Sequence, residues 1–296
     1  MRHLPIDSKL FTQNRERLRA LLEPDSLVIV NANDVLPTNA DGTLVLCPNS
    51  DLFYLTGIEQ EESILVLAPD AVDEKHREIL FLREPSEHLK LWEGHKHPKE
   101  EAQKISGIQE IRWLSEFPIF LHMLMCESET VYLNSNEHRR AVIAVPTRDA
   151  RFATELQGKY PLHKYQRLAR LLHELRPVKS KLEIALMKQA CAITRKGFLR
   201  VLKKTKPGLN ECDIEAEFAH DADGMRDFVN CLNTFDTRVY RRRRKIAKEG
   251  FVWGGHFLPG NPLNGLVGQV FGEVIARLVK VGFHGCCLVI DWRLPV

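Results

Sequence analysis

Side chains suited to metal chemistry occur in two short segments of the 296-residue sequence. Asp221–Gly224 (DADG) begins like a calcium-binding loop, in which carboxylates at alternate positions bind the ion. Such a loop needs glycine at its sixth position and glutamate at its twelfth, whereas here glycine is fourth and the twelfth residue is Leu232. His95–His97 (HKH) offers two imidazoles, but residues two apart do not share a helix face and the segment is a polar loop. We therefore predict no metal site in either segment.

Two other stretches could in principle bind phosphate groups. Gly265, Gly268 and Gly272 have the wrong spacing for a dinucleotide-binding fingerprint, and no strand is evident before them. Arg241–Lys245 is a basic run, but the region around it shows no aromatic interleaving and no known nucleic-acid module. We interpret the run as a solvated surface and predict no nucleic-acid partner.

The composition is that of an ordinary globular protein. Hydrophobic residues make up 44% and charged residues 27%, and the net charge of +3 is too small to imply nucleic acid or an anionic membrane. No apolar run is long enough to cross a bilayer, and residues 1–11 lack the apolar core of a signal peptide. The seven cysteines have no CxxC spacing and indicate reduced thiols. We expect a cytoplasmic protein without membrane association.

Residues 1–175 alternate between strand-like and helix-like segments, which predicts a mixed α/β domain with its sheet between helices. The predicted strands, short apolar runs separated by polar segments, are Ser26–Asn31, Thr43–Cys47, Ile64–Ala68, Glu78–Leu82, Glu110–Trp113 and Thr130–Leu133. The predicted helices are Ser8–Leu22, Pro98–Ser106, Ser115–Cys126 and Arg148–Leu156. In the first helix the spacing predicts Phe11 and Leu18 on the buried side and Arg15, Arg17 and Arg19 on the exposed side.

The segment Asn49–Gly57 (NSDLFYLTG) is the most distinctive local sequence of this region. Asparagine and serine at its start favour a turn, and Gly57 suits a backbone with positive φ. We interpret it as a turn that leads into a core strand.

A polar connector, Arg176–Ser180 (RPVKS), follows the first domain, because proline disfavours helix at the residue before it. Ser180 and Glu183 then form the sequence pattern of a capping box, which predicts a helix beginning at once. Its apolar stripe is Ile184, Met187, Cys191, Phe198 and Val201, and Lys188, Arg195, Lys196 and Lys203 fall between them. Pro207 and Gly208 should end this helix, and Asn210 with Asp213 should begin another.

Several stretches in combination resemble aminopeptidase P, the Xaa-Pro aminopeptidases. They are NSDLFYLTG at 49–57, LWEG at 91–94, RPVKSKLEI at 176–184 and KPGLNECDIEAEFAH at 206–220, so the resemblance covers about residues 1–220. It implies an N-terminal mixed α/β domain, an α+β "pita-bread" metallopeptidase domain, and removal of the N-terminal residue that precedes proline in peptides. Creatinase and prolidase share this architecture; RPVKSKLEI does not separate them, whereas NSDLFYLTG favours aminopeptidase P.

The resemblance also implies two manganese ions, held by two Asp, one His and two Glu. Beyond His220 the sequence no longer resembles the family, and its composition changes: residues 221–296 contain ten of the 17 glycines and carry a net charge of +4. Asp291 follows the strand-like Cys287–Ile290, but no glycine stands two residues later and the sequence ends five residues on. The remaining carboxylates and histidines of this tail are Asp221, Asp223, Asp227, Asp236, Glu249, Glu273, His256 and His284.

We therefore assign no catalytic, metal-binding or substrate-binding residue, and we expect this chain alone to bind no manganese and to be inactive. The predicted divisions are an aminopeptidase P N-terminal domain at 1–175, a linker with the entry helices of an incomplete metallopeptidase domain at 176–222, and a divergent tail at 223–296. Two other hypotheses stay open. The chain could be a non-catalytic interaction module that forms a homo-oligomer through its N-terminal domain, or the tail could have an unrecognised activity.

Overall fold

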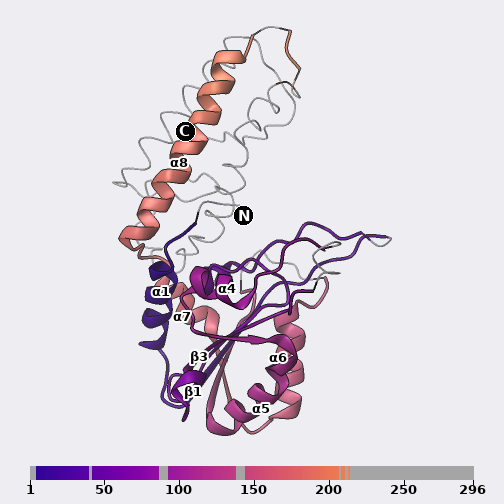
Figure 1. Cartoon of the computed structure of the whole chain (residues 1–296), viewed down its shortest axis with the longest axis vertical. Helices are drawn as coiled ribbons and strands as arrows, with labels where there is room; N and C mark the ends of the chain where they lie inside the picture. Colours follow the sequence, from indigo (N-terminus) through magenta and orange to yellow (C-terminus); the bar gives the residue numbers. More distant parts are fainter. Residues whose placement is uncertain are drawn as a thin grey trace, which may run out of the picture. The chain divides into compact units, whose positions relative to one another are not determined.

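The computed structural model describes residues 5–39, 42–86, 93–137, 144–206, 208–210 and 213 (Figure 1). Within them, residues 5–178 form one compact unit, and the residues from 179 onward belong to a second unit. The strands of the first unit are β1 Ser26–Asn31, β2 Ile64–Leu67, β3 Glu78–Leu82, β4 Glu110–Trp113, β5 Thr130–Leu133 and β6 Lys164–Arg167. Its α-helices are α1 Lys9–Arg19, α2 Ser50–Thr56, α4 Lys99–Ser106, α5 Phe117–Glu127, α6 Arg148–Lys159 and α7 Leu168–Leu175, with short 3-10 turns at Glu74–Arg77 and Leu114–Glu116.

The six strands form one mixed sheet in the order β4-β3-β2-β1-β5-β6. β2 runs antiparallel to both β1 and β3, whereas the pairs β3–β4, β1–β5 and β5–β6 are parallel. In the centre of the sheet, Ile29 lies opposite Val66 on one side and Leu133 on the other. The predicted mixed α/β fold is confirmed.

The sheet is buried on both faces. Val28 and Val30 belong to an apolar cluster with residues of α1, α2, α4 and α7, while Leu27 and Ile29 pack with residues of α5 and α6. Figure 1 shows the same two layers, with α1, α4 and α7 on one side of the strands and α5 and α6 on the other. Because successive strand residues point to opposite faces, an unbroken apolar strand such as β1 needs helices on both sides.

Two of the local predictions are wrong. Thr43–Cys47 is not a strand: Thr43 makes one isolated bridge to Pro37, and Val45 is 76% exposed. Asn49–Gly57 does not lead into a strand but forms helix α2, with Gly57 at its end at a φ of 71°. The positive φ of Gly57 is confirmed.

Arg15 is also not on the exposed side of α1. Its side chain is completely buried; Nη1 donates to the carbonyl oxygens of Leu55 and Ser106, at 2.6 and 2.9 Å, and Nε donates to Glu78 Oε1 at 2.6 Å. The arginine therefore joins α1 to the end of α2, the end of α4 and the start of β3, and the helical pattern alone could not reveal those partners.

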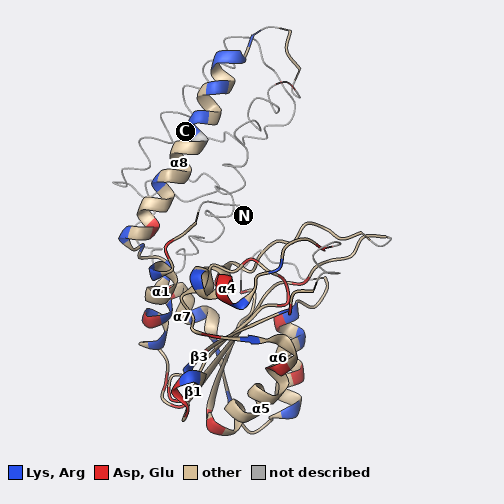
Figure 2. Ribbon diagram, viewed as in Figure 1, with Lys and Arg blue, Asp and Glu red and all other residues tan. Residues whose placement is uncertain are grey.

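In the second unit, helix α8 spans Lys181–Lys204, and the predicted capping box is present. Ser180 N donates to Glu183 Oε2 at 2.6 Å, and Glu183 N donates to Ser180 Oγ at 3.2 Å. Figure 2 shows Lys and Arg along most of α8, and the predicted polar positions Lys188, Arg195, Lys196 and Lys203 are exposed. The stripe is less uniform than predicted, because Val201 is buried but Ile184 is 39% exposed.

The start of the next predicted helix is described only in part: Asn210 N donates to Asp213 Oδ2 at 3.0 Å. The predicted pita-bread elements and the tail lie outside the described residues. Within the described ranges, no helix has the length and apolar composition needed to span a membrane.

Candidate functional site: the polar joint at the end of the first unit

A buried ion pair connects the last residues of the first unit to α2. Arg176 Nη1 contacts Asp51 Oδ1, and only 6% and 14% of the two side chains are exposed. The guanidinium carbon lies 5.3 Å from the ring centroid of Tyr54, a cation–π distance. The second carboxylate oxygen of Asp51 accepts a hydrogen bond from Asn134 Nδ2 at 3.0 Å. Asp51 is thus held from two directions, by the connector and by the end of β5.

Asn49 positions Asp51 by capping α2. Its side-chain oxygen accepts from the backbone N–H groups of Asp51 and Leu52 at 2.9 and 3.3 Å, which satisfies two otherwise unpaired donors of the first turn. Its Nδ2 donates to the carbonyl oxygen of Asn31 at 2.8 Å and so attaches the helix start to the end of β1. The asparagine and aspartate of the NSD sequence therefore have structural partners.

Asp149, in the first turn of α6, completes the polar group at the carboxyl ends of the parallel strands β1 and β5. Asn31 Nδ2 donates to Asp149 Oδ1 at 3.0 Å. Burial raises the pKa of Asp149 to about 6, the charge of Asp51 acts in the same direction, and the hydrogen bond from Asn31 opposes it. The carboxyl edge of an open α/β sheet is where such folds commonly bind ligands. Here, however, the charged and amide groups named above bind one another.

Arg17 of α1 holds the connector from the other side. Its Nη2 donates to the carbonyl oxygen of Leu175 at 2.8 Å and lies 3.4 Å from that of Val178. These two carbonyls flank Arg176, so the chain leaves the first unit between a charge partner on α2 and a donor on α1. We call Arg17, Asp51, Asn134 and Arg176 the joint residues.

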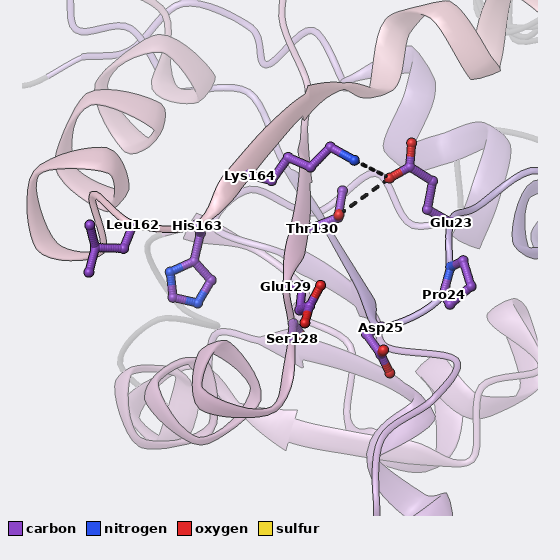
Figure 3. A pocket seen from close by; sticks show the side chains of 9 residues that line it. All are labelled: Glu23, Pro24, Asp25, Ser128, Glu129, Thr130, Leu162, His163 and Lys164. Carbon is purple, nitrogen blue, oxygen red and sulfur yellow. Dashed lines mark hydrogen bonds and ion pairs between the residues drawn. The ribbon is translucent and has the colours of Figure 1, made fainter.

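A separate hollow of about 670 Å³ lies at the amino ends of β1, β5 and β6 (Figure 3). In Figure 3, Lys164 and Thr130 both reach Glu23 Oε2, at 2.8 and 3.4 Å, and the hydrogen bond from Lys164 lowers the pKa of Glu23. The other lining residues are Pro24, Asp25, Ser128, Glu129, Leu162 and His163. The charges of Lys164 and Glu23 neutralise each other in this ion pair. We therefore assign this hollow no ligand.

The sequence did not predict that the side chains of His95 and His97 converge. The two rings do lie together, and Glu101 of α4 lies between them, so that three potential ligand atoms fall within 4.8 Å of one another. His95 and His97 lie in the loop before α4, as predicted, and the loop brings their side chains together.

The other motifs weighed from the sequence lie outside the described residues. These are Leu91 and Trp92 of the LWEG stretch, Asp221–Gly224, Arg241–Lys245, the glycines at 265, 268 and 272, and all the acidic residues and histidines of the tail. The described residues do not fit a pair of manganese ions: the one group of three or more potential ligands among them is His95, His97 and Glu101, which has a single carboxylate.

A mixed sheet between two helical layers is the architecture expected for the N-terminal domain of aminopeptidase P. Residues 11–132 match the family "Aminopeptidase P, N-terminal domain".

The relatives agree with this assignment. Xaa-Pro aminopeptidase of Escherichia coli is 27% identical over 222 residues, covering 73% of this chain and 49% of the relative, and human Xaa-Pro aminopeptidase 3 is 26% identical, covering 76% and 46%. A solved structure described as an aminopeptidase P from Bacillus anthracis matches with a TM-score of 0.66 at 29% identity, covering 74% of this chain and 52% of that one. The chain spans about half the length of these relatives.

One alignment extends further. Intermediate cleaving peptidase 55 of Schizosaccharomyces pombe aligns with 98% of this chain and 63% of its own length, at 20% identity. That alignment includes residues beyond His220, where the sequence resemblance described above ends.

Proposed function

We propose that residues 5–178 are the non-catalytic N-terminal domain of an Xaa-Pro aminopeptidase, whose whole protein removes the residue before proline from peptide N-termini. The observation that carries this proposal is the Asp51–Arg176 ion pair. It joins the NSD stretch to the RPVKS stretch, and both stretches belong to the segments that resemble the family.

We further propose that the 296-residue chain alone does not catalyse this reaction. Two manganese ions need a ligand set dominated by carboxylate oxygens. Support comes from the described residues, whose one three-membered ligand group is rich in imidazole, and from the tail, where no family-like ligand could be assigned.

The test is an assay of the purified chain with manganese and a peptide whose second residue is proline, with the E. coli Xaa-Pro aminopeptidase as positive control. We expect no release of the first residue above the rate without protein. Manganese-dependent release that is abolished by a chelator would overturn the proposal of inactivity, while leaving the domain assignment in place.

A second candidate function is assembly into a homo-oligomer through the first unit. An arm formed by residues 35–39 and 42–45 exposes four aliphatic side chains, and the backbone bonds Leu44 N to Leu36 O (2.8 Å) and Thr38 N to Gly42 O (2.9 Å) hold it in shape. The exposed side chains are Val35, Leu36, Leu44 and Val45, at 38%, 53%, 54% and 76%. Such a group of exposed apolar residues favours a protein contact.

The arm can be tested by measuring the mass of the protein in solution by light scattering during gel filtration. If the arm mediates assembly, the variant Leu36→Asp/Val45→Asp is a monomer at concentrations where the wild-type protein is not. The matched control is Val72→Asp, because Val72 is 84% exposed at a site remote from the arm in the sequence. A wild-type protein that is monomeric throughout excludes this second function.

A further inference from the structure

Two histidines and a glutamate converge at the start of α4. Glu101 Oε2 lies 2.7 Å from His95 Nε2, and Glu101 Oε1 lies 3.2 Å from His97 Nδ1. The two ring centroids are 5.5 Å apart and the ring planes are nearly perpendicular. One carboxylate therefore faces both imidazoles, with a different oxygen toward each ring.

The loop that carries the histidines is attached on its inner side. Lys96, between them, is 8% exposed; its Nζ pairs with Glu61 and lies 3.5 Å from Glu93 Oε2. The backbone N–H of His97 donates to Gln60 Oε1 at 2.8 Å. Lys96 is directed inward, and His95 and His97 both face Glu101.

Pro98 places Glu101 within reach of the loop. It is the N-cap of α4, with an extended ψ of 163°, and the helix begins at Lys99. Glu101 is thus in the first helical turn, four residues after His97. Burial raises the pKa of the Glu101 carboxyl, but hydrogen bonding to His95 and the nearby His97 and His95 rings outweigh it, so that the net pKa is lowered.

We propose that His95, His97 and Glu101 bind one divalent transition-metal ion of the zinc class. Two imidazole nitrogens and one carboxylate oxygen are a known ligand set for zinc, and this set is too rich in nitrogen for calcium or magnesium. A tetrahedral ion with bonds of about 2.1 Å needs ligand atoms about 3.4 Å apart. The ligand atoms lie within 4.8 Å of one another, so small side-chain rotations are enough to close the site.

The site has one movable ligand and an accessible fourth position. The His95 side chain is 61% exposed, whereas those of His97 and Glu101 are 21% and 27% exposed. A bound ion would cross-link the loop at 93–97 to α4 and leave a position for water or an outside ligand. This inference goes beyond the proposed function and does not depend on it, because it rests only on contacts among residues of the first unit.

The experiment is a calorimetric titration of tag-free, reduced, chelator-treated protein with ZnCl₂. The informative pair of variants is Glu101→Gln and Glu100→Gln, because both remove one carboxylate from the first turn of α4 but Glu100 is exposed and outside the site. We expect wild-type and Glu100→Gln proteins to bind zinc alike, Glu101→Gln to bind at least about tenfold more weakly, and His95→Gln/His97→Gln to lose this binding step.

Metal ligation can also be read from the wild-type protein without any variant. With one equivalent of Cu²⁺, the electron paramagnetic resonance spectrum should show hyperfine coupling to imidazole nitrogen. Circular dichroism melting curves with chelator establish that each variant is folded. The same zinc affinity and stoichiometry in the wild-type and folded double-histidine proteins would overturn the proposal and leave the cluster as a hydrogen-bonded group only.

Discussion

Arg176 and Asp51 lie 125 residues apart in the sequence and form a buried ion pair. The pair connects the residue that precedes the proline of the connector to the first turn of α2. Asn134 occupies the second oxygen of Asp51, so the carboxylate has a donor for each of its oxygens. Removing one partner of a buried pair leaves the other charge without compensation, and this cost exceeds the net contribution of the intact pair.

We predict that Arg176→Met lowers the free energy of unfolding by about 3–5 kcal/mol. Asp51→Asn/Arg176→Met should lose less than the sum of the two single variants, because it removes both charges. The control is Arg151→Met, whose pair with Asp34 has side-chain exposures of 52% and 30% and should contribute about 1 kcal/mol or less. Urea unfolding of the full chain measures all four values, and equal losses in Arg176→Met and Arg151→Met would contradict the prediction.

The raised pKa of Asp149 predicts a pH-dependent gain in stability for Asp149→Asn. A carboxyl with a higher pKa in the folded state binds its proton more tightly there, so the free energy of unfolding falls as the pH rises from about 4 to above 6. The shift from 3.8 to about 6 corresponds to a loss of about 3 kcal/mol at most. Asparagine cannot ionise, and its side-chain oxygen can still accept from Asn31.

We therefore expect Asp149→Asn to raise the free energy of unfolding at pH 7.5, by up to about 3 kcal/mol, and to change it little at pH 4. Glu155→Gln is the control on the same helix, because Glu155 is 62% exposed and paired only with Lys159 at the surface. Its effect should stay within about 0.5 kcal/mol at both pH values. A gain from Asp149→Asn that is the same at pH 4 and pH 7.5 would show that ionisation of this carboxyl is not its cause.

Replacing three glycines by alanine should change the stability by different amounts, because their backbone conformations and surroundings differ. Gly57 ends α2 at a φ of 71°, and a Cβ there would lie 2.6 Å from Phe11 Cζ, so Gly57→Ala should cost about 3 kcal/mol or more. Gly94 has a φ of 82° with no heavy atom within 4 Å of such a Cβ, so Gly94→Ala should cost about 1–2 kcal/mol. Gly158→Ala, inside α6 in open space, should gain about 0.5–1 kcal/mol. Thermal melting measures the series, and any other order would refute the assignment of strain and crowding.

The sequence correctly predicted those helices and strands whose signal lies within a few neighbouring residues. The capping box of Ser180 and Glu183 marked the start of α8, and the almost wholly apolar run of Ser26–Asn31 marked a strand covered on both faces. By contrast, β6 was missed because Lys164–Arg167 has polar residues on an edge strand. Thr43–Cys47 has strand-like residues but pairs with none of the strands in the described part of the chain, and pairing depends on distant sequence.

The candidate site was less predictable than the fold, because its contacts join residues remote in sequence. Asp51 and Arg176 belong to stretches that looked distinctive, yet nothing in either stretch identifies the other as its partner. The cluster of His95, His97 and Glu101 was missed for a different reason. Its residues are close in sequence, but their convergence depends on Lys96 pointing inward to Glu61 and on the helix beginning only after Pro98.

The partners of Arg15 are also remote in sequence and could not be predicted from the helical pattern. On the helical pattern it resembles Arg17 and Arg19, but its fork of donors reaches Glu78, Leu55 O and Ser106 O inside the unit. Burial lowers the pKa of Arg15, and the adjacent Glu78 opposes this effect. Lysine carries a single ammonium group and cannot reach these acceptors in the same geometry.

We expect Arg15→Lys to lower the free energy of unfolding by about 2–4 kcal/mol, because buried acceptors lose their donors. Arg19→Lys is the matched control: Arg19 also contacts Glu78 Oε1, at 2.6 Å, but its side chain is 30% exposed and water can replace the lost bond. Its loss should be about 1 kcal/mol or less. Urea unfolding measures the loss of free energy of unfolding in both variants. Equal losses would contradict the prediction and show that the contacts of Arg15 to Leu55 and Ser106 contribute little to stability.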